Sequence, residues 1–255
     1  MHDVLDRLVG NARSLVASSY YRTKGREAEG VPLSRALRSA ASFPVIAEVK
    51  LSSPSAGRIT SQAPAALIDA YVRGGATALS VLTEPNHFGG SLGALDEAGR
   101  SGLPVLMKDI VVDSAQVEAG AARGAGAVLL IQRAFSRGLA GNRDDLISYA
   151  HGLGLEVVLE AGNADELREA QESEADILGL NQRDLGTMVV DPTMGERVLS
   201  DFAQDARPLV IMSGIRERGQ VERLRDLGAS AVLVGTSLSS SPDPASALAT
   251  LVVPR

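Results

Sequence analysis

Gly228-Ala229-Ser230-Ala231-Val232-Leu233-Val234-Gly235 carries the pattern that decides the fold of this chain: a glycine, small residues, and a short apolar run that ends in another glycine. Glycine and small residues also precede two other apolar runs, at Gly74-Gly75-Ala76-Thr77-Ala78 and at Gly124-Ala125-Gly126-Ala127. Glycine at such a place ends a helix in a left-handed cap and lets the chain turn into a strand. The repeated helix–glycine–strand unit therefore predicts parallel βα construction.

Eight apolar runs of strand length occur, at residues 45–50, 78–83, 105–109, 127–131, 156–160, 177–181, 209–213 and 231–235. They lack strict polar alternation, as strands covered on both faces do. Eight units in about 200 residues favour a closed (β/α)8 TIM barrel over an open doubly wound sheet. No Gly-x-Gly-x-x-Gly follows the first run to indicate a dinucleotide fold.

Residues 1–44 precede the first strand, and we expect them to form an N-terminal helical extension of a single-domain protein whose barrel spans residues 45–255. Residues 3–17 read as an amphipathic helix, with Val4, Leu8, Ala12 and Leu15 on one stripe. Residues 32–41 read as a second short helix. Since the apolar stripe needs cover, we expect both helices to pack on the mouth or the bottom of the barrel.

Composition excludes several classes of function. The chain has 255 residues, a net charge of −6, no cysteine and no tryptophan. Disulfides, thiolate metal sites and cysteine nucleophiles are therefore absent, and the negative charge with few aromatic residues goes against a nucleic-acid partner. No apolar run reaches the ~18–20 residues that span a bilayer, so we expect no membrane partner. The N-terminal segment lacks a signal-peptide core, which favours a cytoplasmic location. The sequence assigns no oligomeric state.

Lysine is rare, and two of the three lysines end strand-like runs. Among 25 Lys plus Arg, the lysines are Lys24, Lys50 in PVIAEVK and Lys108 in PVLMKD. A desolvated ammonium can lose its proton and act as an acid or a base, whereas a guanidinium cannot. We therefore interpret Lys50 and Lys108 as catalytic residues. Chance placement of both lysines on the surface is the alternative.

Active sites of TIM barrels lie at the C-terminal ends of the strands, where this chain carries polar groups. Glu48 and Lys50 are two residues apart, so both side chains point to the same face of the first strand. In the lumen they would form an ion pair that perturbs both proton affinities. Later strands end in Lys108, Glu160, Asn181 and Ser213. These groups predict an active site; a salt-bridged rim that closes the barrel is the alternative.

Two glycine-containing segments suggest a phosphate seat. Ser213-Gly214-Ile215 follows the seventh strand and Gly235-Thr236-Ser237 follows the eighth. Glycine lets backbone N–H groups approach an anion, and a following short helix would direct its N-terminus there. Arg183, just past the sixth strand, could add a bidentate contact. Simple turn chemistry is the alternative for each glycine.

The loop Lys50-Leu51-Ser52-Ser53-Pro54-Ser55-Ala56-Gly57, together with Glu48, resembles the signature of the indole-3-glycerol-phosphate synthase family. Further segments resemble that family in the correct order, from about residue 32 to the C-terminus. They are residues 79–84 with Phe88 and Gly90-Ser91, and residues 104–109, 179–185, 213–215 and 234–238.

The resemblance implies a TIM-barrel lyase that needs no metal or organic cofactor. Its small-molecule phosphorylated substrate is 1-(2-carboxyphenylamino)-1-deoxyribulose 5-phosphate: a ring carbon attacks the chain carbonyl, carbon dioxide leaves, and water follows. It implies Lys108 as the general acid at the carbonyl, Lys50 as carboxylate ligand or dehydration acid, and Glu160 as base. Which lysine acts at which step stays open. It further implies that Glu48 orients and tunes the lysines, and that Asn181 and Ser213 hold chain hydroxyls and catalytic groups. The phosphate would be held by Gly214, Gly235, Thr236 and Arg183. The aromatic end would be lined by Ser53, Pro54 and Phe88.

Four positions depart from the family pattern. Met212 replaces an acid, Leu51 a basic residue, Ile110 a phenylalanine, and Ala161-Gly162 a larger residue and a polar one. We expect three of these changes, at Met212, Leu51 and Ala161-Gly162, to make one pocket more apolar or smaller. They leave two alternatives to the ordinary synthase: a diverged paralogue that acts on a related N-aryl or other phosphosugar, and a barrel that binds a phosphorylated ligand without catalysis. The retained lysines and Glu160 speak against the latter.

Overall fold

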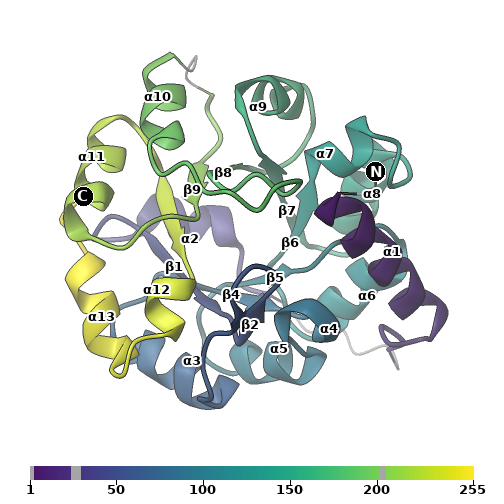
Figure 1. The fold of residues 1–255 in the computed structure, drawn as a ribbon, viewed down its shortest axis with the longest axis horizontal. Coiled ribbons are helices and arrows are strands. Elements are labelled where there is room, and N and C mark those ends of the chain that lie inside the picture. Colours follow the sequence, from purple (N-terminus) through teal and green to yellow (C-terminus); the bar gives the residue numbers. More distant parts are fainter. Residues whose placement is uncertain (1–2, 24–29, 202–204) are drawn as a thin grey trace.

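The eight principal strands close into one parallel barrel (Figure 1). The computed structural model describes residues 3–23, 30–201 and 205–255. Neighbours in the barrel follow chain order, and β1 pairs with both β4 and β10. The strands are β1 (Val45–Val49), β4 (Ala78–Leu82), β5 (Val105–Lys108), β6 (Ala127–Ile131), β7 (Glu156–Ala161), β8 (Ile177–Asn181), β9 (Leu209–Met212) and β10 (Ala231–Val234). The predicted TIM barrel is confirmed, and every expected strand begins at the expected residue.

Helices cover the outside of the barrel, and shorter elements lie at its carboxyl end (Figure 1). The longer ones are α3 (Pro64–Arg73), α5 (Leu92–Gly99), α6 (Ser114–Ala122), α8 (Arg143–Gly152), α9 (Ala164–Gln171), α10 (Met194–Asp201), α11 (Arg218–Asp226) and α13 (Pro244–Leu251). The shorter ones are α4 (Pro85–Phe88), α7 (Gln132–Ser136), α12 (Thr236–Ser239) and a hairpin of β2 (Ser52–Ser53) and β3 (Gly57–Arg58).

Strand residues alternate between the lumen and the helix layer. In β1, Val45 and Val49 pack in the core cluster shared with the outer helices, whereas Ile46 belongs to a second cluster inside the barrel. Glu48 is two residues beyond Ile46 and therefore points into the lumen. The same alternation brings Lys108, two residues after the lumen residue Leu106, to the inside of β5.

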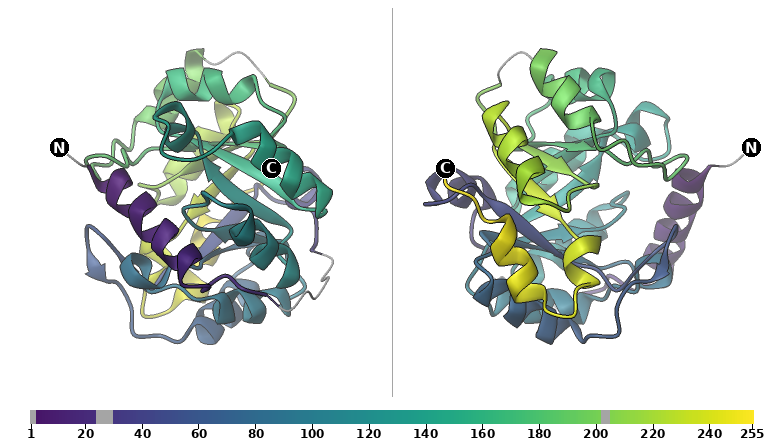
Figure 2. Two further views of the ribbon diagram at one scale, coloured as in Figure 1. Left: turned by 90° about the vertical axis from the view of Figure 1, so that its right-hand side faces the viewer. Right: turned by 60° about the vertical axis from the view of Figure 1, so that its left-hand side comes forward.

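Two N-terminal helices pack at opposite ends of the barrel. In Figure 1, α1 (Val4–Ala17) lies in front of the barrel and α2 (Leu33–Ser39) is drawn fainter behind it. The turned views of Figure 2 show α1 beside the mouth. Ser34 of α2 binds Glu156 at the start of β7, with an N···Oε2 distance of 2.7 Å. In the structure α1 packs at the mouth and α2 at the bottom of the barrel.

The buried stripe of α1 differs slightly from the expected one. Leu5, Leu8, Val9 and Ala12 are buried, whereas the outer members of the predicted stripe are only partly covered. Asp3 caps the helix in a capping box with Asp6. Residues 1–2 and 24–29 of the expected extension, Lys24 included, lie outside the described residues. Within the described ranges, no helix is long and apolar enough to cross a membrane.

Candidate active site

A cavity of about 480 Å³ opens at the carboxyl ends of the strands. Its wall includes almost every residue that the sequence predicts for the site: Glu48, Lys50, Ser53, Phe88, Lys108, Glu160, Asn181, Arg183, Ser213, Gly214, Gly235 and Thr236. Pro54 is the exception, because it is exposed at the turn of the β2–β3 hairpin and does not line the cavity. These predicted residues come from seven separate strands or the loops after them, and they converge on one small volume.

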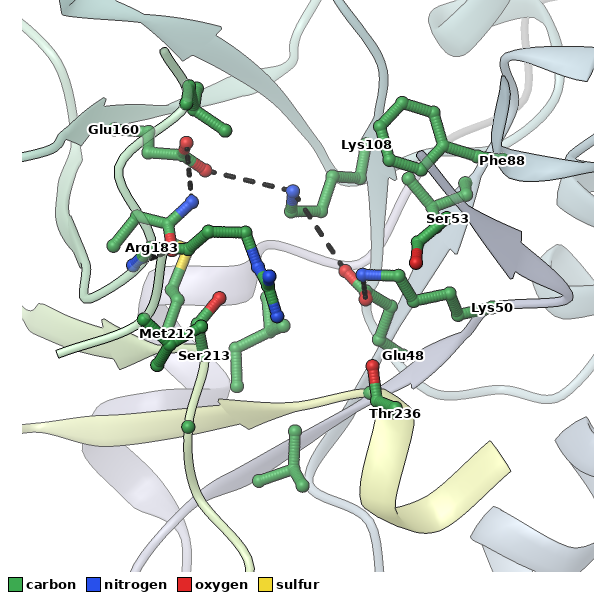
Figure 3. A pocket seen from close by; sticks show the side chains of 18 of the residues that line it. Glu48, Lys50, Ser53, Phe88, Lys108, Glu160, Arg183, Met212, Ser213 and Thr236 are labelled. Carbon is green, nitrogen blue, oxygen red and sulfur yellow. Dashed lines mark hydrogen bonds and ion pairs between the residues drawn. The ribbon is translucent and has the colours of Figure 1, made fainter. Parts of the chain in front are cut away.

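Two lysines and two glutamates form a connected charge network in this cavity (Figure 3). Lys108 Nζ lies 3.7 Å from Glu160 Oε2 and 3.9 Å from Glu48 Oε2. Lys50 Nζ lies 3.2 Å from Glu48 Oε1. The carboxylates are buried, but the lysine side chains keep 15% and 18% of their surface exposed. The lysine side chains are therefore the more exposed members of the network.

Glu48 and Lys108 keep their charges despite burial. Burial by itself raises the pKa of Glu48, but the charges of Lys50 and Lys108 outweigh it, so the pKa of Glu48 lies below its ordinary value. Burial likewise acts to lower the pKa of Lys108, but Glu160 and Glu48 outweigh it and raise the pKa of that ammonium. Lys108 is therefore protonated at neutral pH, which is the state that a general acid needs.

Asn181 and Arg183 occupy the wall opposite Lys50. Asn181 Nδ2 donates to Glu160 Oε1 at 2.9 Å, and Asn181 Oδ1 accepts from the backbone N–H of Arg183 at 3.0 Å. Arg183 extends into the cavity (Figure 3), where its Nη1 donates to the carbonyl of Met188 at 2.9 Å. Asn181 therefore orients Glu160 while the guanidinium keeps further donors for a ligand.

The loop after β9 holds a backbone conformation that few residues adopt. Ser213 and Gly214 have φ angles of 68° and 78°, and a non-glycine residue with positive φ stores strain of about 1–3 kcal/mol. Gln182, which is buried, holds the loop by donating to the Ser213 carbonyl at 2.6 Å. Its Oε1 accepts from the Gly195 amide at 2.9 Å. Sequence reasoning assigned no role to Gln182, although it lies between Asn181 and Arg183.

Gly235 leaves room for the Glu48 side chain, for a reason that the sequence does not reveal. A Cβ at Gly235 would lie 2.3 Å from Glu48 Oε1, so the carboxylate would have to shift. The absent side chain of Gly235 is therefore the space in which the Glu48 carboxylate sits. The glycine serves the charge network as well as the loop after β10.

The apolar end of the cavity is built around Phe88. Its helix α4 is capped by Glu84, whose carboxylate accepts from the backbone N–H groups of Asn86, His87 and Phe88. Lys50 Nζ lies 6.0 Å from the centre of the Phe88 ring, and Leu8 of α1 adds to the wall. The roles of Glu84 and Leu8 at this site were not predicted from the sequence. The Glu84-Pro85 pair, an acid before a proline that begins a helix, was the available signal.

Only some of the residues that differ from the family pattern line the cavity. Met212 and Ile110 line it and are buried. Leu51 instead packs against the outer core cluster, and Ala161 is buried in that cluster, so neither lies on the wall. The expectation that three of these changes alter one pocket is wrong for these two positions. The reason is strand alternation: Ala161, next to lumen-facing Glu160, faces the helix layer.

Metal ligands are not gathered at this site. Among the residues that the structure describes, no group of three or more His, Cys, Asp or Glu side chains could hold a metal ion. The expected absence of a metal and of an organic cofactor stays a prediction.

Comparison with known proteins identifies the family. A family model described as indole-3-glycerol phosphate synthase matches residues 9–251. The chain belongs to this family. It is accordingly a carboxy-lyase that catalyses decarboxylative ring closure in tryptophan biosynthesis. The buried acid–base network and this membership together go against the alternative of a barrel that only binds.

Two curated relatives carry the family name. The indole-3-glycerol phosphate synthase of Dehalococcoides mccartyi is 42% identical over 213 residues, which cover 82% of this chain and 81% of that protein. The one of Haloarcula marismortui is 39% identical over 196 residues, covering 76% and 71%.

Solved structures of more distant proteins share the fold alone. Thiamine phosphate pyrophosphorylase from Pyrococcus furiosus superposes with a TM-score of 0.60 at 15% identity, covering 82% of this chain and 93% of that one. N-acetylmannosamine-6-phosphate 2-epimerase from Clostridium perfringens gives 0.59 at 15% identity, covering 77% and 88%.

Proposed function

We propose that the cavity closes the indole ring of 1-(2-carboxyphenylamino)-1-deoxyribulose 5-phosphate, with Lys108 as the general acid. The single observation that carries this assignment is the position of Lys108 Nζ between Glu160 and Glu48. Both carboxylates keep the ammonium charged, and the lysine side chain lines the cavity. A fixed acid beside the reacting carbonyl lowers the barrier of a step in which negative charge develops on that oxygen.

The bond changes assign a task to each charged group. The ring carbon that bears the carboxylate attacks the chain carbonyl, and Lys108 gives its proton to the carbonyl oxygen. Carbon dioxide then leaves, its bonding electrons restore the aromatic ring, and loss of water completes the pyrrole. Glu160 accepts a proton as base, and Lys50 binds the carboxylate or donates the proton for dehydration. Glu48, which contacts both lysines, orients them.

The phosphate would bind across the cavity from the aromatic end. Gly214, Gly235 and Thr236 line the cavity, and Arg183 extends into it (Figure 3). Ser237 Oγ donates to the carbonyl of Ile215 at 3.0 Å, so the loops after β9 and β10 are tied together. A rigid seat for the dianion would fix the chain carbonyl relative to Lys108. Ser213 would hold chain hydroxyls, while Phe88 and Ser53 would line the ring.

Turnover of the anthranilate substrate tests the proposal. The chain has no tryptophan, so indole emission from the product appears against little protein background. We expect turnover by the parent, a folded Lys108→Ala variant with kcat lowered by about 100-fold or more, and a similar loss in Lys108→Arg, which keeps the charge but cannot give up a proton. A Lys108→Ala enzyme that retained most of its activity would refute the assignment of the acid.

Met212 favours a second candidate, a diverged paralogue that acts on a related N-aryl or other phosphosugar. The side chain is 1% exposed on the cavity wall, where the family pattern has an acid. A substrate without a partner for that acid would fit the apolar wall better. Poor affinity for the anthranilate substrate together with turnover of another N-aryl phosphosugar would support this candidate. A cytoplasmic location, phosphate binding and the absence of nucleic-acid and membrane partners remain parts of the proposal.

A further inference from the structure

Strand β1 loses one neighbour at the point where it presents its catalytic side chains. Pairing between β1 and β10 ends at Ala47↔Val234, because the chain leaves β10 at Gly235 and turns into α12. Glu48 and Lys50 lie beyond this last pair. On its other side β1 stays paired with β4 as far as Val49. The edge that faces β10 therefore needs another source of hydrogen bonds.

The groups left on that edge are the carbonyl of Glu48 and the amide of Lys50. Pro44 O accepts from Val232 N of β10 at 3.1 Å. Because carbonyl and amide groups two residues apart in a strand face the same side, the Glu48 carbonyl and the Lys50 amide face the same way. A buried backbone group without a partner costs about 1–3 kcal/mol, and Glu48 is buried.

Ser239 of α12 occupies the position that a further residue of β10 would take. Its Oγ accepts from Lys50 N at 3.3 Å and donates to Glu48 O at 3.1 Å. One hydroxyl thus satisfies an amide and a carbonyl of β1, as the backbone of a paired strand would. Ser239 is fully buried, so water does not compete for these groups.

Tyr71 of α3 completes the arrangement from the helix layer. Its hydroxyl lies 2.9 Å from Ser239 Oγ and 3.3 Å from Glu48 O. When Tyr71 donates to Ser239 and Ser239 donates to Glu48 O, every hydrogen and both lone pairs of Ser239 are used. Burial raises the pKa of Tyr71, so the phenol remains a donor across the working pH range.

We infer that Ser239 and Tyr71 are positioning residues for the ring-closing reaction: their hydroxyls extend the β1 ladder past the end of β10 and fix the direction in which Glu48 and Lys50 enter the cavity. The inference rests on the proposed function, in which Glu48 and Lys50 act on the substrate. It also connects two parts of the site, because α12 begins with Thr236 at the phosphate wall and carries Ser239 at the charge network.

Kinetics of Ser239→Ala and Tyr71→Phe in the full chain test the inference. We expect Ser239→Ala to lower kcat by about tenfold or more while KM changes less than about threefold, because a misdirected acid–base pair affects the chemical step and not ground-state binding. Tyr71→Phe should give a smaller loss of the same kind. Ser200→Ala and Tyr149→Phe, on the exposed faces of α10 and α8, are matched controls.

A double-mutant cycle separates positioning from general destabilisation. If Ser239 acts through Glu48 and Lys50, Ser239→Ala should lower kcat by a smaller factor in a Glu48→Gln background than in the parent, because one of the two groups that it positions has already lost its charge. The same fold-loss in both backgrounds, or a kcat within twofold of the parent for Ser239→Ala alone, would overturn the inference.

Hydrogen exchange at the Lys50 amide decides the inference independently of turnover. NMR of the parent and of Ser239→Ala should show exchange at Lys50 about tenfold faster or more in the variant, with unchanged protection in β6 and β7. Absence of turnover in the parent would refute the proposed function and leave this measurement intact. Equal exchange at Lys50 in both proteins would refute the ladder itself.

Discussion

At the scale of one residue, Met212 shows how the barrel lumen accommodates an apolar side chain where the family pattern has an acid. A Cβ on Gly179 of the neighbouring strand would lie 2.5 Å from Met212 Cε, so the thioether end fills the space that glycine leaves. Asn181, which orients Glu160, is the register partner of Met212. A side chain at position 212 therefore contacts the layer of the barrel that holds the base.

Met212→Glu should raise kcat/KM for the anthranilate substrate by about tenfold or more. The reason is that a charged hydrogen bond in a buried site contributes about 1.5–3 kcal/mol, and the family pattern places an acid there. Met212→Leu, which keeps the apolar wall, is the control. Steady-state fluorescence measures both. An unchanged or lower kcat/KM in Met212→Glu would instead favour the diverged paralogue.

Asp109 gives the protein a stability that depends on pH. Burial raises the pKa of Asp109 to about 6, although Thr83 and Tyr21 donate hydrogen bonds to it. The folded state therefore holds this proton more tightly than the unfolded chain, whose aspartates titrate near pH 4. Stability falls as pH rises from about 4 to 6 and is then constant with respect to this group.

Urea unfolding of the parent and of Asp109→Asn between pH 4 and pH 7 should reveal the pH dependence of stability that Asp109 causes. The free energy of unfolding of the parent, measured relative to the variant, should decrease by about 3 kcal/mol over that range, as a shift of about two pKa units implies. A difference between the two proteins that stays constant with pH would contradict the raised pKa.

At the scale of elements, α1 and α4 are joined by a polar contact at the cavity mouth. Asn11 Nδ2 donates to Glu84 Oε1 at 2.7 Å, and Asn86 Nδ2 donates to Asn11 Oδ1 at 2.7 Å. Glu84 is fully buried and also caps α4. The helix that carries Phe88 is therefore held from both its own cap and the N-terminal extension.

Asn11→Ala should raise KM for the anthranilate substrate by about threefold to tenfold and leave kcat closer to the parent value. Phe88 lies at the aromatic end, so loosening α4 weakens binding of the ring before it affects proton transfer. Loss of a donor to a buried carboxylate should also cost about 1–3 kcal/mol of stability, which a thermal melt measures. Ser14→Ala on the same helix is the control. An unchanged KM would show that α1 does not support the ring pocket.

The sequence predicts elements well where their signal is local. The Gly-Ala entries and apolar runs located all eight barrel strands, and the expected ends differ from the observed ones by one residue at most. The β2–β3 hairpin and the helix α4 were not predicted, because four-residue helices and two-residue strands have no periodicity to read. The short helix expected near the loop after the eighth strand is α12 (Thr236–Ser239). Spacing placed Glu48 and Lys50 on one face, but the contacts of Ser239, Gln182 and Glu84 join distant segments and leave no local pattern.

The whole molecule is one barrel on which the two N-terminal helices pack at opposite ends. Residues of α1 and α2 share a core cluster with lumen residues from every barrel strand, so the extension and the barrel should unfold together. That the chain forms a single domain remains a prediction. Calorimetry should give one transition with equal calorimetric and van't Hoff enthalpies. Two separated transitions would show that the extension is an independent unit.

The distribution of lysine has a practical consequence for handling the protein. Reagents directed at primary amines, used for sensor-chip coupling, dye attachment or reductive methylation, find few targets in this chain, and two of them point into the cavity. Such labelling would consume the very groups under study, whereas a saturating ligand would shield them. Attachment through a terminal tag or an introduced surface cysteine, in a chain that has no cysteine of its own, leaves the interior untouched.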